Sequence, residues 1–315
     1  MTNKAIRIID GQPQLVDLPR VDDVPADHVR VKVISSSICG SDFHLIDMGI
    51  AEGLVLGHEF AGTTPDGTAV AVEPIKHCGH CASCDDGFRS SCTGDTALLG
   101  VSTDGGMATE VVVPATTLVE LPGGVDVSVA SLVEPLAVAT HAVNYGELKG
   151  GERVLVLGAG PIGLATAAIL AERGVPCDIS ARHPHQQEAA EMLGATLNVR
   201  DGYDVVIDAV GSSGSIGEAV QALRPRGRLV VVGTFWDPVS IDVGIQMKEI
   251  RLIPSMTYAG LAPNRDFDTA ARALANNPLI AEALITHRFP LDGAADAFEV
   301  ARDRAAGAIK VVFDV

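Results

Sequence analysis

The sequence has no long apolar run. No stretch approaches the roughly 18 consecutive apolar residues of a membrane-spanning helix. The start, MTNKAIRIIDGQPQL, has charged and polar residues where a signal peptide needs an apolar core. We therefore expect a soluble, cytoplasmic protein with no membrane partner.

Positive charge is also scarce. The chain has 23 basic and 40 acidic residues, so its formal net charge is -17. Such a field repels phosphate backbones and anionic lipid surfaces. We therefore expect no nucleic-acid partner, and an anionic cofactor needs a local basic pocket.

The length and the rhythm of the sequence predict two domains. The 315 residues are 47 % hydrophobic and include 33 glycines and 17 prolines, which excludes disorder and collagen-like repeats. From Lys4 to about Pro114, short runs rich in Val, Ile and Ala indicate an antiparallel, barrel-like unit. From about Glu152, apolar runs alternate with helical segments, which is typical of βαβ units around a parallel sheet. The closing strand, IKVVFDV, is able to rejoin the first domain.

A glycine-rich turn lies between the strand-like run RVLVL and the helical run IGLATAAILAERG. Gly158 permits a tight turn, Gly160 lets the backbone approach a pyrophosphate, and Gly163 lets the helix pack on the strand. The helix N-terminus offers unpaired N–H groups to phosphates, and a proline there costs little. The motif predicts dinucleotide contacts at Gly158, Gly160, Pro161, Ile162 and Gly163. The alternative is a glycine-rich turn without a ligand.

The end of the next strand indicates which dinucleotide binds. A carboxylate there bonds a free ribose 2′-OH, whereas a cation accepts a 2′-phosphate. Asp178 falls inside the strand, and no acid stands at its tip. Arg182 can pair with a phosphate in bidentate fashion, so NADP is favoured over NAD, with contacts from Ser180, Arg182 and His183. The alternative is a solvated arginine at a helix start.

Four of the six cysteines fall within fifteen positions, in the pattern CxxCxxCx7C. A secreted disulfide framework spreads its cysteines, whereas an intracellular cluster at CxxC spacing indicates a metal site. Four thiolates suit a tetrahedral zinc ion. We predict a structural zinc lobe at about 77–93, with Cys78, Cys81, Cys84 and Cys92 as ligands.

A second set of metal-ligand residues is dispersed. Cys39 lies in SSSICGSDFH, His58 and Glu59 in VLGHEFAG, and Glu134 in LVEPLAVATHA. One thiolate, one imidazole and carboxylates can hold a catalytic zinc with an open position for substrate. Spacing alone does not bring these residues together, and the alternative for His58 is a satisfied histidine beside a strand.

Taken in order, the motifs CGSDxH, GHEFAG, CxxCxxCx7C, VEPLAVxxHA and GAGPIG resemble the zinc-dependent medium-chain alcohol and polyol dehydrogenases, essentially end to end. The resemblance implies an α/β protein. Residues 1–135 and 255–315 would form a GroES-like β-barrel catalytic domain, and residues 136–254 an inserted Rossmann domain with a doubly wound parallel sheet. Relatives in this family are homodimers or homotetramers, so a homo-oligomer is expected.

The same resemblance implies roles around the catalytic zinc. Cys39 and His58 correspond to ligands, and Glu59 is able to enter the coordination sphere. Glu134 stands where simple alcohol dehydrogenases have a second cysteine, and it is similar to a glutamate of the sorbitol, threonine and glucose dehydrogenases that binds zinc directly or through water. Asp42 resembles the carboxylate that orients the zinc histidine.

Ser41 and His44 are similar to the proton relay of the family. Aligned through the downstream LGA, the acidic residue of NAD-using members corresponds to Ala181, which resembles NADP-using members. Two intervals, from Cys39 to His58 and from GHEFAG to AVEP, are shorter than is usual, which weakens substrate inference from relatedness. Cys177 matches no ligand position and is interpreted as a buried apolar residue.

We therefore predict a zinc-dependent oxidoreductase with two zinc ions per chain. It would transfer a hydride between NADP(H) and a secondary alcohol, polyol or sugar, or the matching carbonyl. One alternative is an NAD-dependent simple alcohol or amino-alcohol dehydrogenase, and another is a relative that catalyses a non-redox reaction or reduces a conjugated alkene. An alternative of a different class is a zinc-ribbon interaction module with a degenerate nucleotide fold.

Overall fold

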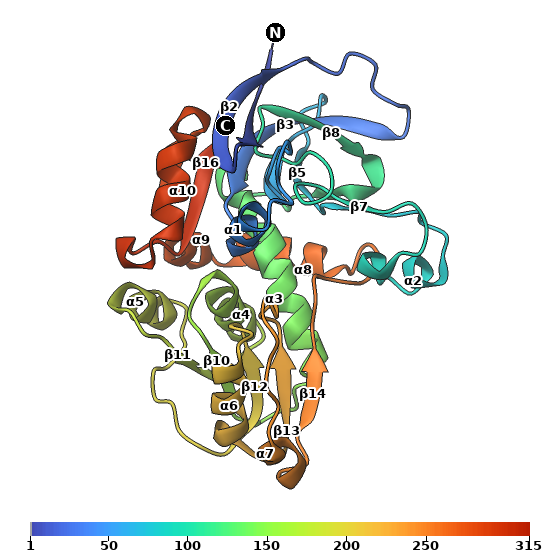
Figure 1. The fold of residues 1–315 in the computed structure, drawn as a ribbon. Coiled ribbons are helices and arrows are strands. Elements are labelled where there is room, and N and C mark those ends of the chain that lie inside the picture. The colour runs from blue at the N-terminus through green and yellow to red at the C-terminus, as the bar shows by residue number, and fades with distance from the viewer. Residues whose placement is uncertain (1) are drawn as a thin grey trace. The chain divides into compact units, whose positions relative to one another are not determined.

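The computed structural model describes residues 2–315 (Figure 1). The contacts divide the chain into two compact units. Unit 1 combines residues 2–134, Ala259–Asn276 and Ile285–Val315, and unit 2 combines Pro135–Tyr258 and Asn277–Leu284.

The boundaries differ from those inferred from the sequence, which placed them at 135/136 and 254/255. The chain leaves unit 1 after Glu134 and returns at Ala259. Helix α9 (Leu279–Leu284), assigned from the sequence to the catalytic domain, packs instead on α4 (Pro161–Glu172) and α5 (Pro184–Met192) of unit 2. The reason is apolar burial, because Ile280 and Leu284 are fully buried.

Unit 1 is built on a seven-stranded sheet that is antiparallel except for one parallel pair, β15 and β16. The strand order is β15-β16-β3-β4-β5-β9, and β8 also pairs with β3. The long strand β3 therefore contacts three partners, and a core of buried Val and Phe residues lies against these strands. The strands are β3 (His28–Ser37), β4 (Glu59–Thr63), β5 (Ala69–Val72), β8 (Glu110–Pro114), β9 (Leu118–Glu120), β15 (Ile285–Pro290) and β16 (Lys310–Asp314).

A second core of unit 1 joins the two ends of the chain. The hairpin β1 (Asn3–Ile9) and β2 (Gln12–Leu18) contributes Ile6 and Ile8, and helix α10 (Ala294–Arg302) contributes Phe298. Further helices and two short strands complete the unit. They are α1 (Gly40–Asp47), β6 (Ile75–Lys76), α2 (Ala82–Asp85), η1 (Arg89–Ser91), β7 (Ala97–Leu98), η2 (Ala115–Thr117), η3 (Val127–Leu132), α8 (Asp266–Asn276), η4 (Leu291–Gly293) and η5 (Arg304–Ala306).

Unit 2 contains a five-stranded parallel sheet in the order β11-β10-β12-β13-β14. Successive strands are added on one side of β10 up to β11 and on its other side from β12 onward. Ligands of such sheets bind outside the carboxyl ends of the strands at this switch point. The elements are α3 (Val133–Tyr145), β10 (Val154–Leu157), α4, β11 (Cys177–Ser180), α5, β12 (Tyr203–Asp208), α6 (Ser213–Ala222), β13 (Leu223–Val231), α7 (Val243–Met247) and β14 (Arg251–Pro254).

The doubly wound sheet is reduced at one edge. In the six-stranded form of this fold, a third strand lies beyond the second. Here the corresponding segment makes one isolated parallel bridge, between Asp178 and Thr196. The fold class predicted from the sequence, a barrel-like unit plus a doubly wound parallel sheet, is confirmed.

One helical stretch modifies the expectation about membrane spans. By length and composition, Val127–Tyr145 is apolar enough to cross a bilayer, although polar residues such as Ser131 and Glu134 interrupt it. Of that stretch, 67 % is buried inside the protein, as in the core helix of a globular unit.

The glycine turn yields a stability prediction. A Cβ on Gly163 would lie 1.7 Å from the carbonyl oxygen of Gly158, because α4 packs directly on the end of β10. Gly163→Ala should therefore lower the free energy of unfolding by about 1–3 kcal/mol or more, measured by denaturant unfolding.

Gly160→Ala is the matched control. Gly160 has an ordinary φ of -79°, and a Cβ added there would meet no atom of the described residues within 4 Å beyond its own neighbours along the chain. Its stability should change by less than about 0.5 kcal/mol. Equal losses in the two variants would contradict the packing argument.

Candidate active site and metal centres

Cys39 is positioned by the start of helix α1. It is the N-cap residue, and its backbone N–H donates to Oδ2 of Asp42 at 2.9 Å, which forms one half of a capping box. The half-buried thiol thus lies at the start of a helix whose backbone geometry is set by local hydrogen bonds.

His58 lies between Asp42 and Ser41. Its Nδ1 is 3.6 Å from Oδ1 of Asp42, and its Nε2 is 3.4 Å from the Ser41 hydroxyl. Asp42 is completely buried, and His58 is 8 % exposed. The two ring nitrogens therefore face different partners, as expected for a metal-binding histidine oriented by a carboxylate.

Glu59 is held by a buried ion pair. Both of its carboxylate oxygens lie 2.8 Å from Nζ of Lys310, and Ser37 donates its hydroxyl to the same carboxylate. Lys310 also donates to the carbonyl of Ile38 at 3.2 Å. Strand pairing places these residues together, since Ser37 pairs with Glu59 across β3 and β4 and with Val312 across β3 and β16.

The site holds more negative than positive groups. Burial raises the pKa of Glu134 to about 8, with further increases from Glu59 and Asp42, against the opposing effects of His58 and Lys310. Burial also raises the pKa of Asp42 to about 6. For both carboxylates, burial outweighs the opposing effects of His58 and Lys310.

Burial acts in the opposite direction on the pKa values of His58 and Lys310, because it disfavours their protonated, charged forms. Burial alone would lower the pKa of His58, but the thiol of Cys39 and the neighbouring carboxylates raise it well above its ordinary value. Burial likewise opposes protonation of Lys310, and Glu59 and Cys39 outweigh it, so the pKa of this lysine is also raised.

The structure brings three of the four dispersed ligand candidates together. One ligand atom each from Cys39, His58 and Glu59 lie within 4.8 Å of one another. Among residues 2–315, Glu134 does not join this group, although it is buried and interacts electrostatically with His58 and Glu59. The donor set and its excess of buried negative charge fit a divalent cation such as zinc.

The four clustered cysteines form a second metal-binding arrangement. Their sulfurs lie within 4.8 Å of one another, and three of the pairs are separated by 3.5, 3.9 and 4.0 Å. A tetrahedron with Zn–S bonds of ~2.3 Å has edges of about 3.8 Å, whereas a disulfide needs about 2.05 Å. The spacing of the sulfurs therefore fits one tetrahedral ion.

The predicted dinucleotide turn is formed as the sequence indicates. Gly158 follows β10 with a φ of +89°, Gly160 is the N-cap of α4, and Pro161 begins the helix. The helix then continues through Ile162 and Gly163, with its N-terminus at the carboxyl end of β10.

The second strand, β11, ends without an acid that is free to bind a ribose. Asp178 accepts hydrogen bonds from Tyr203, at 2.6 Å, and from Thr196, so both of its oxygens are engaged within the unit. Arg182 follows the strand and is exposed, and His183 is the N-cap of α5. Ser180 lines a hollow of about 330 Å³ in the same unit.

Comparisons with known proteins decide the family. A model of the "Alcohol dehydrogenase GroES-like domain" matches residues 25–123, and one of the "Glucose dehydrogenase C-terminus" matches residues 127–315. The L-galactonate-5-dehydrogenase of Escherichia coli K12 is 30 % identical over 95 % of this chain and 95 % of its own. The chain belongs to the zinc-dependent medium-chain dehydrogenase family.

Two solved structures of this family share the whole fold. The alcohol dehydrogenase RspB of Escherichia coli CFT073, solved with NADH, is 30 % identical, with a TM-score of 0.87 over 100 % of this chain and 99 % of its own. A protein described as a zinc-binding dehydrogenase of Sinorhizobium meliloti 1021, bound to NADP, is 27 % identical, with a TM-score of 0.85 over 100 % of both chains. The resemblance stated from the motifs is confirmed, and the protein is an oxidoreductase of the alcohol and polyol dehydrogenase type.

Two residues of this dehydrogenase that contact the candidate site were not predicted from the sequence. Lys310 and Ser37 hold Glu59, yet the sequence analysis gave neither residue a role. The signal that could have found them was a lysine inside the apolar closing strand IKVVF, because a lysine at a buried strand position needs a charged partner.

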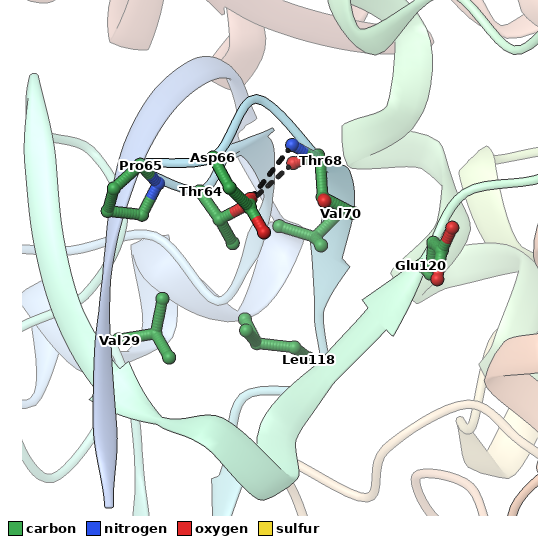
Figure 2. Close-up of a pocket in the computed structure, with 8 residues that line it drawn as sticks. All are labelled: Val29, Thr64, Pro65, Asp66, Thr68, Val70, Leu118 and Glu120. Carbon is green, nitrogen blue, oxygen red and sulfur yellow. Dashed lines mark hydrogen bonds between the residues drawn. The ribbon is translucent and has the colours of Figure 1, made fainter. Parts of the chain in front are cut away.

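A surface hollow of about 520 Å³ lies elsewhere in unit 1 of this dehydrogenase (Figure 2). Of the described residues that line it, none is a predicted site residue. They are Val29, Thr64, Pro65, Asp66, Thr68, Val70, Leu118 and Glu120.

The buried ion pair yields a prediction. Lys310→Met leaves the carboxylate of Glu59 buried without a cation, so the free energy of unfolding should fall by about 3–5 kcal/mol, measured by denaturant unfolding. The double variant Lys310→Met, Glu59→Gln removes the uncompensated charge and should recover part of the loss. A double variant as unstable as the sum of the two single variants would show that the pair is not coupled.

Proposed function

We propose that the protein is a zinc-dependent oxidoreductase that transfers a hydride between NADP(H) and a secondary alcohol, polyol or sugar, or the matching carbonyl. The observation that carries the proposal is the convergence of Cys39, His58 and Glu59 within 4.8 Å, with the Ser41 hydroxyl 3.4 Å from His58. The relative named for L-galactonate supports a polyhydroxylated substrate.

In this proposal, Cys39 and His58 hold a catalytic zinc, and Glu134 binds it directly or through water. When bound, the zinc would supply Lewis acidity toward the substrate oxygen, and the nicotinamide would supply the hydride chemistry. Asp42 keeps Nδ1 of His58 turned toward itself, which leaves Nε2 for the metal side.

The protein's own groups move the proton. Ser41 accepts the proton of the substrate hydroxyl and passes it outward toward His44, an exposed histidine one turn further along α1. Glu59 lies next to the metal position, and Lys310 and Ser37 hold it there. Its carboxylate would be able to enter the coordination sphere of that metal.

The second zinc is proposed for Cys78, Cys81, Cys84 and Cys92. These four thiolates leave no open position for substrate, so this ion is structural. The spacing of their sulfurs supports the assignment.

The preference for NADP rests on the end of β11. Arg182 is exposed there, while both carboxylate oxygens of Asp178 already accept hydrogen bonds, from Thr196 and Tyr203. Ser180, Arg182 and His183 would contact the 2′-phosphate, and the helix start at Gly160 would bind the pyrophosphate. The relative solved with NADP supports this cofactor, whereas the one solved with NADH favours NAD as the second candidate.

The metal assignment is tested by Cys39→Ala. We expect no turnover and a fall in zinc content from about two ions per chain to about one, because one open site is lost and one closed site remains. Elemental analysis of folded protein, checked by circular dichroism, measures the change.

Cys177→Ala is the control, since Cys177 is buried in β11 and burial raises its pKa to about 12. This variant should retain both ions. Retention of both ions by Cys39→Ala would remove Cys39 from the metal site.

The cofactor assignment is tested by Arg182→Ala. The dissociation constant for NADPH should rise about 10-fold to 100-fold, because charge-assisted hydrogen bonds to the phosphate are lost, while that for NADH should stay nearly constant. Fluorescence titration measures both constants. Arg226→Ala, whose side chain is 81 % exposed, controls for the loss of one positive charge. Equal weakening of both cofactors by Arg182→Ala would refute the proposed preference.

A further inference from the structure

The seven residues between Cys84 and Cys92 contact a segment far along the chain. We call residues 85–91 the clasp loop, and residues 259–268, where the chain re-enters unit 1 after β14, the return segment. Two separate contacts join them, one through the backbone and one through buried charges.

The backbone contact joins two glycines. The N–H of Gly260 donates to the carbonyl of Gly87 at 3.1 Å. A Cβ on Gly87, which has a φ of +82°, would lie 3.0 Å from the Cα of Gly260. The two backbones therefore approach as closely as the absence of side chains permits.

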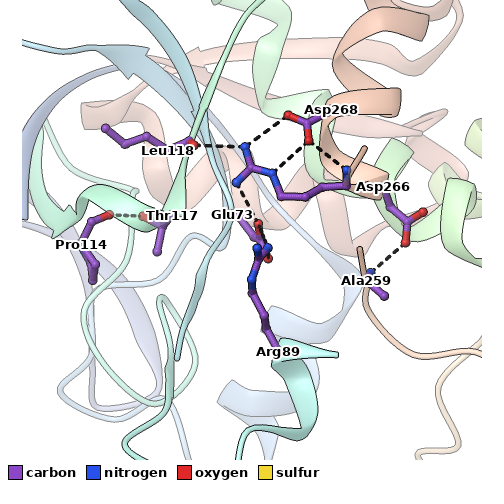
Figure 3. Close-up of polar contacts among 9 residues, drawn as sticks. Glu73, Arg89, Pro114, Thr117, Leu118, Ala259, Asp266 and Asp268 are labelled. Atoms are coloured by element: carbon purple, nitrogen blue, oxygen red, sulfur yellow. Dashed lines mark hydrogen bonds and ion pairs between the residues drawn. The ribbon is translucent and has the colours of Figure 1, made fainter. Parts of the chain in front are cut away.

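The charged contact runs through Glu73, which follows β5 (Figure 3). Arg89 of the clasp loop donates to both oxygens of Glu73, at 3.0 and 2.9 Å. Arg265 of the return segment approaches the same carboxylate at 3.4 Å and pairs with Asp268 at 3.0 Å. Glu73 is 3 % exposed and both arginines are under 10 % exposed, so solvent screens these contacts little.

Two local hydrogen bonds close the return segment into a loop. The N–H of Ala259 donates to the Asp266 side chain at 2.7 Å, and the N–H of Asp266 donates back to the carbonyl of Ala259 at 2.9 Å. Asp266 begins α8, so the segment closes into a loop that leads directly into this helix.

From these contacts we infer that the ion bound by the four cysteines orders the return segment and the start of α8 through the clasp loop. The inference rests on the proposed structural zinc. Cys84 and Cys92 flank the clasp loop on either side, so an ion that binds both fixes the loop that carries Gly87 and Arg89. Without the ion, the ordering of the loop must come from the protein contacts alone.

The test is hydrogen exchange of the full-length protein, followed by mass spectrometry. In Cys92→Ser, which removes one ligand, and in Arg89→Met, which leaves the four sulfurs intact, exchange of the amides of Gly260 and Asp266 should rise about tenfold or more, a change of about 1.4 kcal/mol. Protection of β10 and β12 should not change, which shows that unit 2 remains folded.

Lys76→Met is the matched control within the lobe. Lys76 pairs with Asp95 at 2.8 Å, but both side chains are exposed and neither contacts the return segment through a described ion pair or hydrogen bond. Exchange of residues 259–268 should therefore stay as in the unchanged protein.

Zinc content separates the two ideas. If Cys92→Ser loses about one ion per chain while exchange of the return segment is unchanged, the clasp is overturned and the proposed function stands. If Cys92→Ser loses no ion, the structural zinc of the proposed function is wrong, and the inference falls with it. Unchanged exchange in Arg89→Met also overturns the clasp, whatever the metal content.

Discussion

The candidate active site of this dehydrogenase depends on an imbalance of buried charge. Glu59, Glu134 and Asp42 lie in a region from which water is largely excluded, where an isolated carboxylate is strongly destabilised. Lys310 compensates one of them directly, and the raised pKa values of the other two show that the compensation is incomplete. A divalent cation beside Cys39 and His58 would supply the missing positive charge. Electrostatics thus explains why these residues suit a metal.

The two groups of metal-ligand residues differ in chemistry. Around Cys39, donors of three kinds lie beside a serine hydroxyl, a set that in the proposed function would leave one metal position open for a substrate. Around Cys84, four like donors enclose one position, and the surrounding residues connect that lobe to α8. Helix α8 in turn contacts η3, the helical segment that directly precedes α3, whose second residue is Glu134. The lobe and the active site therefore share a continuous set of packed elements within unit 1.

Sequence reasoning succeeded where function and structure are local. GAGPIG sets a strand, a turn and a helix start within a few residues, and CxxCxxCx7C brings four sulfurs together through short loops. It failed where partners are distant, as for Lys310 and Glu59, which are 251 positions apart. The assignment of α9 to unit 2 and the reduction of the third strand to one bridge at Thr196 likewise depend on tertiary packing. For Asp178, the sequence placed the residue inside the strand, and only the structure shows its bonds to Tyr203 and Thr196.

Unit 1 is assembled from segments at both ends of the chain, and this affects how the protein folds. Strand β16 pairs with β3, so residues near position 312 must find residues near position 37. Such distant pairings form slowly, because a long chain must close before the contact stabilises it. During synthesis, Glu59 emerges well before Lys310 and has no cation until the final strand arrives. Unit 2 lies largely between them in the sequence and can fold first. The ion pair between Glu59 and Lys310 therefore forms only after β16 has been synthesised and has paired with β3, so the charge balance of the candidate site depends on one of the most distant contacts of unit 1.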